Sequence, residues 1–257
     1  MDNVLYEVSD RVCFLTLNRP EKKNALNSEL VSALKERLSQ AEQDSSVKAI
    51  VLKANGDVFC SGADLESLQK LQNNTHQENL DDSKHLMELF RQIYTLKKVV
   101  IAQIQGHALA GGCGLATVCD FSFVVPQAKL GYTEVRIGFV PAIVMVFLLR
   151  KIGEQRARQL LLGGELITGN DAVSMGLVNF VAESDKIEGE VRAFAQRLVT
   201  GNSSKSLELT KKMIAEVQSM SLDEGLNYAA EMNANARATE DCKRGIAAFL
   251  NKEKLSW

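Results

Sequence analysis

Hydrophobic and polar positions in the first part of the chain follow two alternating periods. Short runs of β-branched and other apolar residues have the pattern of strands, and between them apolar residues recur every three or four positions, as in helices. The predicted strands are residues 5–8 and 12–17, joined as a hairpin at 9–11, then 47–53, 99–104 and 120–125. The predicted helices cover residues 30–41 and 86–96. Strands that alternate with helices predict an α/β fold with mostly parallel pairing.

Beyond residue 185 the strand signals vanish and only the helical period remains. Its apolar positions are Ile187, Val191, Phe194, Leu198; Leu207, Met213, Val217; Leu222, Leu226, Ala230; and Ile246, Phe249, Leu250. This change predicts two regions: a core, residues 1–185, and a helical region, residues 186–257, that forms a lid or an oligomer interface. Within the core, the Gln- and Asn-rich residues 69–79 predict a mobile surface loop.

Composition narrows the class of protein. The chain has 257 residues, 46% of them hydrophobic, which is enough for one large core. A net charge of −2 gives no reason to expect nucleic acid or an anionic membrane as partner. The longest apolar run, near residues 143–149, is too short to span a bilayer, and no signal peptide is evident, so we expect a cytoplasmic protein. Five cysteines without a C-x-x-C pair, and three scattered histidines, predict reduced thiols and no metal centre.

A glycine cluster, residues 106–114, follows the predicted strand 99–104 and opens a short helix. Free N–H groups at a glycine-rich helix start stabilise negative charge, and the downstream carboxyl group of Glu134 can move a proton beside them. A dinucleotide-binding turn is a weaker interpretation, because Glu134 does not end a strand. Taken alone, the glycines are also explained by close packing of a helix on a strand.

A second motif, residues 59–65, follows strand 47–53 and also opens a helix, with Asp64 as N-cap or first-turn acid. Two strand-to-helix turns, each with an exposed amide, suit a carbonyl oxygen held from two sides. Ser61 is a poor candidate nucleophile, since G-x-S-x-G is absent and no histidine is suitably placed. The two turns together predict an enzyme that works beside a carbonyl group.

These motifs, in this order, resemble the crotonase (enoyl-CoA hydratase/isomerase) superfamily. The matching segments are residues 18–20, 24–27, 59–64, 106–116 with 119–120, and 134–138 with Pro141. Gly114 together with residues 141–154 resembles the methylglutaconyl-CoA hydratase-like subgroup most closely. The resemblance extends nearly from end to end of the chain.

The resemblance implies an α/β spiral of ββα units, a C-terminal α-helical region, and a homotrimer or homohexamer. It implies an acyl-CoA thioester substrate with no separate cofactor, since CoA is part of the substrate. The amides of Ala63 and Gly111 match the two oxyanion-hole donors, and Glu134 matches a catalytic glutamate. The predicted substrate-binding residues are Lys23, Ala25, Cys60, Asp64, Leu65, His107, Gly114, Tyr132, Ala142, Phe147 and Lys252. Among these, Lys252 matches a lysine that reaches CoA phosphate. Tyr132 and Phe147 are expected to line the acyl pocket, with packing in the core as the alternative.

The chain departs from two-glutamate hydratases at Gly114, where those enzymes carry their first catalytic glutamate. We expect Gly114 to leave open space, and Gly114→Glu to raise straight-chain hydration if the missing carboxylate is what limits it. A single glutamate can still add or remove water on a branched enoyl-CoA by taking and returning one proton, which is our first interpretation. A Δ3–Δ2 double-bond shift is the alternative, and a non-catalytic CoA-binding scaffold is a third.

Overall fold

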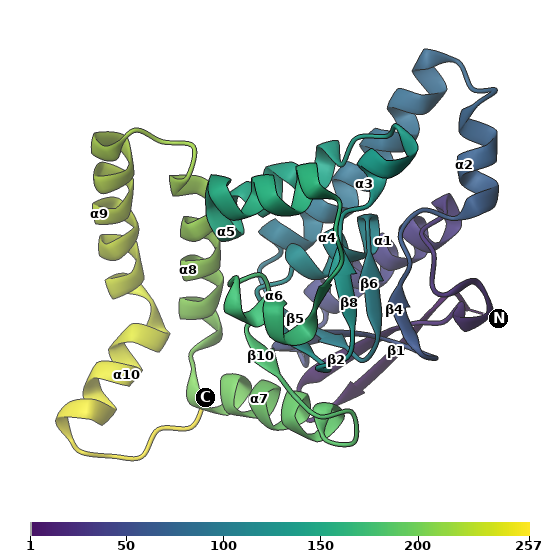
Figure 1. The fold of residues 1–257 in the computed structure, drawn as a ribbon. Helices are drawn as coiled ribbons and strands as arrows, with labels where there is room; N and C mark the ends of the chain where they lie inside the picture. Colours follow the sequence, from purple (N-terminus) through teal and green to yellow (C-terminus); the bar gives the residue numbers. More distant parts are fainter. Residues whose placement is uncertain (1) are drawn as a thin grey trace.

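The computed structural model describes residues 2–257, apart from the side chains of Leu65 and Leu71. Within these residues the strands form two sheets (Figure 1). The larger sheet contains, in spatial order, β1 (Val4–Ser9), β2 (Val12–Leu17), β3 (Ala49–Ala54), β5 (Val99–Ile104), β7 (Phe121–Val124) and β10 (Phe180–Val181). The smaller sheet contains β4 (Val58–Cys60), β6 (His107–Leu109), β8 (Lys129–Gly131) and β9 (Ile167–Thr168).

The chain builds these sheets by repeating one unit. A strand of the larger sheet leads into a short strand of the smaller sheet and then into a helix: β3 to β4, β5 to β6, and β7 to β8. The strands of each set pair in parallel with their counterparts, whereas the β1–β2 hairpin is antiparallel. The predicted α/β class with mostly parallel pairing, the predicted hairpin and the spiral of ββα units are therefore confirmed.

The helices surround these sheets. Their bounds are α1 (Ser28–Gln43), α2 (Leu65–Leu71), α3 (His76–Thr95), α4 (Gly111–Thr117), α5 (Ala142–Gly163), α6 (Gly169–Ser174), α7 (Ile187–Gly201), α8 (Ser204–Val217), α9 (Leu222–Ala238) and α10 (Glu240–Leu250), with 3-10 turns η1 (Pro20–Lys22) and η2 (Glu134–Ile137). Helix α7 packs on β2, β3, β5 and β7, and α8 packs on α3 and β5. The four helices predicted beyond residue 185 are confirmed, while the domain boundary stays a prediction.

The predicted loop at residues 69–79 is too long, because only residues 72–75 lie outside helices. Helix α2 continues to Leu71 and α3 already begins at His76. The reason is a capping box, in which Thr75 Oγ1 accepts a hydrogen bond from Glu78 N and the Glu78 carboxylate accepts one from Thr75 N at 2.7 Å. This reciprocal pair starts a helix even within a polar segment.

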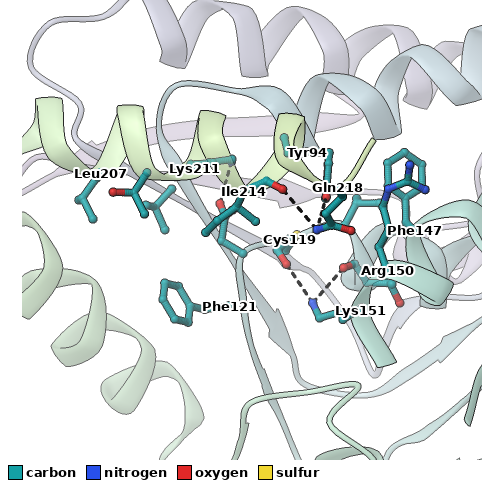
Figure 2. Close-up of a pocket in the computed structure, with 16 residues that line it drawn as sticks. Tyr94, Cys119, Phe121, Phe147, Arg150, Lys151, Leu207, Lys211, Ile214 and Gln218 are labelled. Carbon is teal, nitrogen blue, oxygen red and sulfur yellow. Dashed lines mark hydrogen bonds and ion pairs between the residues drawn. The ribbon is translucent and has the colours of Figure 1, made fainter. Parts of the chain in front are cut away.

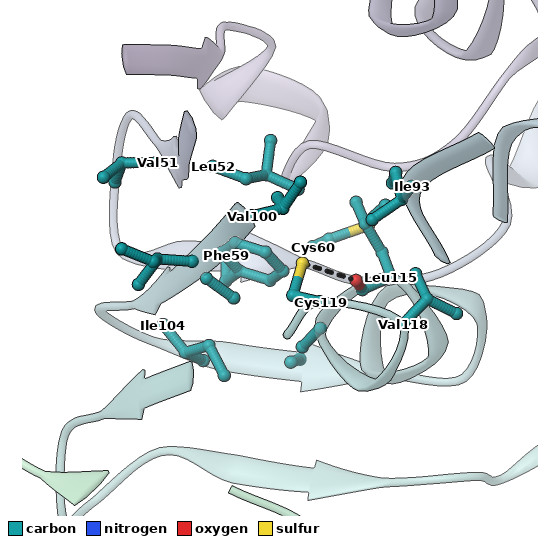
Figure 3. Packing of buried hydrophobic residues seen from close by; sticks show 14 of the residues in the cluster. Val51, Leu52, Phe59, Cys60, Ile93, Val100, Ile104, Leu115, Val118 and Cys119 are labelled. Atoms are coloured by element: carbon teal, nitrogen blue, oxygen red, sulfur yellow. Dashed lines mark hydrogen bonds between the residues drawn. The ribbon is translucent and has the colours of Figure 1, made fainter. Parts of the chain in front are cut away.

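The core lies between the sheets and the helices. Every residue of β2 and of β5 is buried, as expected for central strands covered on both faces. Phe59 and Cys60 from the smaller sheet pack with Leu52 and Val100 from the larger one and with Leu115 of α4 (Figure 3). The cysteines are free thiols, and those at 13, 60, 113 and 119 are buried, as predicted.

The C-terminal helices α9 and α10 stand away from the sheets (Figure 1). They expose large apolar side chains, among them Leu222, Leu226 and Phe249, the last with 82% of its surface accessible. Among the described residues, no helix is both long and apolar enough to cross a bilayer.

Helix α4 rests directly on the backbone of β4. A Cβ atom built on Gly112 would lie 2.2 Å from the Cys60 carbonyl oxygen, far inside van der Waals contact. The Cys60 carbonyl belongs to a paired strand and cannot move aside, so only glycine fits at position 112.

We expect Gly112→Ala to lower the free energy of unfolding by about 3 kcal/mol or more, because the added methyl group overlaps backbone. Gly189→Ala is the matched control: it lies in α7 with open space around the new Cβ, and should gain up to about 1 kcal/mol from helix propensity. Urea denaturation measures both. Equal stabilities of the two variants would contradict the proposed backbone contact.

Candidate active site

The residues predicted to carry the chemistry follow three neighbouring strands of the smaller sheet. Strands β4, β6 and β8 are parallel neighbours, so their carboxyl ends meet at one edge of the smaller sheet (Figure 1). Ala63 follows β4, Gly111 follows β6, and Glu134 follows β8, each within three residues of the strand end. Parallel pairing therefore places all three segments side by side.

The Ala63 amide faces away from its neighbouring strand segment. Leu26 N donates to Gly62 O at 2.7 Å, and Asp64 N donates to Leu26 O at 2.9 Å. In this parallel bridge the Gly62 carbonyl oxygen and the Asp64 N–H, one on each side of Ala63, both bond to Leu26. The N–H of Ala63 itself therefore points away from Leu26. Within residues 2–257 no protein group accepts from that N–H, and Ala63 is exposed.

The Gly111 amide lies beside this turn. Gly111 is the first residue of α4, so its N–H is one of those that a helix leaves without an intrahelical partner. A Cβ built on Gly62, which has a φ of +90°, would lie 3.5 Å from Gly111 N. The two amides therefore belong to backbone turns in direct contact.

Glu134 begins the turn η2 and is half-buried. Its Oε2 atom is buried and has no hydrogen-bond partner within the described part of the chain. Burial raises the pKa of this carboxyl group above its usual value. The carboxylate also lies near enough to Cys113 of α4 to contribute to the raised pKa of that thiol, about 11, although burial is the main cause. A carboxyl group with a raised pKa and one oxygen without a partner is suited to proton transfer.

Asp64 is engaged by protein groups. Its Oδ1 accepts from Glu66 N at 3.0 Å as the predicted N-cap of α2, and its Oδ2 pairs with Arg19 at 3.2 Å. Arg19 also donates to Ala25 O at 2.8 Å, and Ser61 N donates to Lys23 O at 3.1 Å. These contacts fix the segment that carries Ala63. Asp64 therefore supports the turn and is not placed as a second acid.

Four further candidates near this edge have different surroundings. The side chain of Lys23 is exposed. The Cys60 thiol is fully buried behind α4, and this burial raises its pKa to about 12. Ala142 is exposed at the start of α5, eight positions beyond Glu134. The Leu65 side chain lies outside the described structure, although its backbone begins α2.

The space expected beside Gly114 is filled. A Cβ atom on Gly114 would lie 2.2 Å from Val144 Cγ1 and 3.0 Å from Phe90 Cε2. Val144 comes from the first turn of α5 and Phe90 from α3, and both are buried. The expectation that a glutamate at position 114 finds open space is therefore wrong. Sequence reasoning missed Val144, although Val144, Leu148 and Ile152 recur every four residues as the buried face of α5.

His107 is the first residue of β6, so it lies at the opposite end of this strand from Gly111. Its ring is exposed, and Nδ1 accepts a hydrogen bond from Lys129 N at 3.0 Å. This contact links β6 to β8, and contact with an acyl group is not what the structure indicates.

Tyr132 packs in the core, and Phe147 packs beside a cavity. Tyr132 is completely buried and forms a 2.8 Å hydrogen bond with Thr117 Oγ1, which makes it part of the core behind α4. Phe147 packs edge-to-face on Tyr94 and borders a separate cavity of about 400 Å³ at the C-terminal end of α4 (Figure 2). There Lys151 donates to the carbonyl oxygens of Thr117 and Cys119, which caps the helix. Tyr132 is therefore a core residue, which was the alternative for this position, and a role of Phe147 in the acyl pocket stays a prediction.

Lys252 follows α10 and is exposed. Within one chain, α10 lies far from the edge formed by β4, β6 and α4 (Figure 1). The single chain therefore does not bring Lys252 to the amides. Among the described residues there is also no group of three or more His, Cys, Asp or Glu side chains that could hold a metal ion.

Comparisons with known proteins agree with this architecture. A family model described as enoyl-CoA hydratase/isomerase matches residues 7–257. A Thermus thermophilus protein assigned provisionally to the enoyl-CoA hydratases is 42% identical over 94% of this chain and 95% of its own. The crotonyl-CoA hydratase of Syntrophomonas wolfei is 31% identical over 100% of this chain and 98% of its own. The crystal structure of an enoyl-CoA hydratase from Mycobacterium smegmatis superposes with a TM-score of 0.93 at 27% identity. The match covers 99% of this chain and 98% of that one. The chain belongs to the enoyl-CoA hydratase/isomerase family and has the crotonase fold.

Burial of Glu134 gives a pH-dependent stability. Because its pKa is higher in the folded state, this group favours folding below its unfolded pKa of about 4.3, and the contribution is lost as the pH rises through the folded value. We expect Glu134→Gln to raise the Tm at pH 7 and to leave it nearly unchanged at pH 4. Thermal unfolding measures this, with Glu165→Gln, which removes an exposed carboxylate, as control. A lower Tm of Glu134→Gln at pH 7 would contradict this account.

The contact between positions 114 and 144 is open to a double-mutant cycle. Gly114→Ala should lower the free energy of unfolding by about 1–3 kcal/mol, since its methyl group meets Val144. Val144→Ala makes room, so the double variant should be more stable than the sum of the two losses predicts, by about 0.5–3 kcal/mol. Urea titrations of the four proteins provide the cycle, and strict additivity would show that the two positions do not touch.

Proposed function

We propose that this protein adds water to, or removes it from, a branched enoyl-CoA thioester through an enolate. The observation that carries the proposal is the placement of Ala63 N–H, Gly111 N–H and the unpaired Glu134 Oε2 at one edge of the smaller sheet. The names of the relatives support the acyl-CoA class of substrate.

In the proposed reaction the thioester oxygen accepts hydrogen bonds from Ala63 N–H and Gly111 N–H. Negative charge that develops on this oxygen is stabilised by both amides, and the N-terminal end of α4 adds its dipole. One such donor typically contributes about 3 kcal/mol, or a factor of 10²–10³ in rate.

Glu134 supplies the proton transfers. Its carboxylate takes a proton from a water molecule as the water oxygen bonds to C3, and the C2–C3 π electrons move to form the enolate. The protonated Glu134 then returns the same proton to C2, so that water has been added and the carboxylate restored. The raised pKa of Glu134 suits both steps, because the group must hold the proton briefly and give it back.

The surface next to Glu134 supports an apolar branch on the acyl group. Ile137, the last residue of η2, is exposed, and so are Phe139 and Val140 directly after it. Arg136, the cation nearest in sequence, packs its side chain near Gly164 at the end of α5. These side chains favour a methyl-branched acyl group over one with a distal carboxylate.

A Δ3–Δ2 enoyl-CoA isomerase is the second candidate. One observation favours it: Val144 occupies the space where a second carboxylate would enter, so one carboxylate must suffice. In that reaction Glu134 takes a proton from C2 of a 3-enoyl thioester, the same amides stabilise the dienolate, and the proton is returned to C4. A scaffold without catalysis is less well supported, because an unpaired buried carboxylate costs stability and a scaffold has no use for it.

Oligomerisation belongs to the same proposal. The apolar side chains that α9 and α10 expose support a homotrimer or homohexamer in which these helices are covered. In such an assembly Lys252 would reach the CoA phosphates bound by a neighbouring copy.

Glu134→Gln tests the function. We expect its turnover to fall by a factor of about 10² to 10⁴, since the proton carrier is lost while the amides remain. The substrates are crotonyl-CoA, 3-methylcrotonyl-CoA and 3-hexenoyl-CoA, followed by absorbance and product analysis, with CoA binding measured by calorimetry. The exposed Glu165→Gln serves as control and should retain full activity.

The substrate that turns over distinguishes the candidates. Hydration of 3-methylcrotonyl-CoA supports the first proposal, and conversion of only 3-hexenoyl-CoA supports the isomerase. Binding of CoA without turnover of any thioester would leave only the scaffold. Unchanged activity of Glu134→Gln would remove Glu134 from the mechanism.

A further inference from the structure

Ala110, the residue between β6 and α4, has an unusual backbone conformation. Its φ of 50° and ψ of −124° lie in a region that residues with a Cβ rarely adopt. Such a conformation costs about 1–3 kcal/mol in general and persists only where its surroundings enforce it. Ala110 directly precedes Gly111, so this conformation sets the direction of the Gly111 N–H.

Two hydrogen bonds hold Ala110 in place. Its N–H donates to Gly131 O at 2.8 Å, and its carbonyl oxygen accepts from Gly114 N at 3.0 Å. Gly131 is the last residue of β8, three positions before Glu134. Ala110 therefore ties the start of α4 to the strand that carries the proposed base.

The methyl group of Ala110 makes the third contact. A Cβ atom built on Gly62 would lie only 2.9 Å from Ala110 Cβ, so this methyl group packs against the Gly62 backbone. Gly62 directly precedes Ala63, the first proposed amide donor. The Ala110 side chain thus lies between the turn with the Ala63 amide and the helix start with the Gly111 amide.

We infer that Ala110 is a positioning residue, whose methyl group and strained backbone fix the separation and direction of the two amide donors. This inference rests on the proposed function and adds a residue to it. Catalytic donors must be held within about 0.5 Å of their productive geometry, and glycine at position 110 would relieve the strain and remove the spacer together. Alanine is the smallest residue that keeps the contact with Gly62.

Ala110→Gly tests the inference. We expect kcat to fall about tenfold or more with KM nearly unchanged, since donor alignment affects the transition state more than ground-state binding. The Tm should stay within a few degrees, because relief of strain offsets the greater flexibility of glycine. Ala110→Ser keeps the Cβ and should retain most of kcat. Asp10→Gly relieves a similar positive φ of 50° in the β1–β2 turn and should leave kcat unchanged.

A spectroscopic measurement separates positioning from a general structural effect. In the Glu134→Gln background, in which turnover is slowed, bound crotonyl-CoA with an isotope-labelled thioester carbonyl should show a lowered carbonyl stretching frequency. Adding Ala110→Gly should reduce that shift, whereas adding Asp10→Gly should not. Full retention of the shift, or of kcat, in Ala110→Gly overturns the inference. Absence of any shift in Glu134→Gln itself would instead count against the proposed function.

Discussion

The structure depends on one close approach, between the first turn of α4 and the end of β4. At Gly112 the helix touches the Cys60 carbonyl directly, without an intervening side chain. This contact brings the first amide of α4 beside the turn that carries Ala63. The rest of the core, including α3 and α5, packs around this fixed arrangement. A larger residue at position 112 would push α4 away from β4 and so separate the two amides.

The same edge of the sheet concentrates features that reduce stability. Glu134 keeps a buried oxygen without a partner, and Ala110 adopts a backbone conformation that disfavours a side chain. Both costs are consistent with a preorganised site, in which polar groups wait for a substrate that completes their hydrogen bonds. At position 114 the opposite holds, because Val144 fills the space with an apolar contact. The chain therefore has apolar packing at this position in place of a second carboxylate.

Much of the fold was predictable because periodicity reports local structure. The β1–β2 hairpin, the strand at Val99–Ile104 and the helices beyond residue 185 follow from their own residues. The strands of the smaller sheet were not predicted, since two or three residues are too few to show an alternating pattern. The predicted loop at residues 69–79 was too long, because composition does not reveal the capping pair Thr75–Glu78 that begins α3.

The sequence by itself determined the local features of the proposed site: two glycine-rich turns, the N-cap Asp64 that supports one of them, and the lone acid Glu134. Only the tertiary structure decided how they are arranged. His107 lies at the opposite end of β6 from Gly111, because the direction of the strand places it there, and a motif does not reveal that direction. The space at Gly114 is closed by a side chain thirty positions later in the chain. Sequence patterns report periodicity and turn chemistry within a segment, whereas contacts between distant segments depend on how the layers pack.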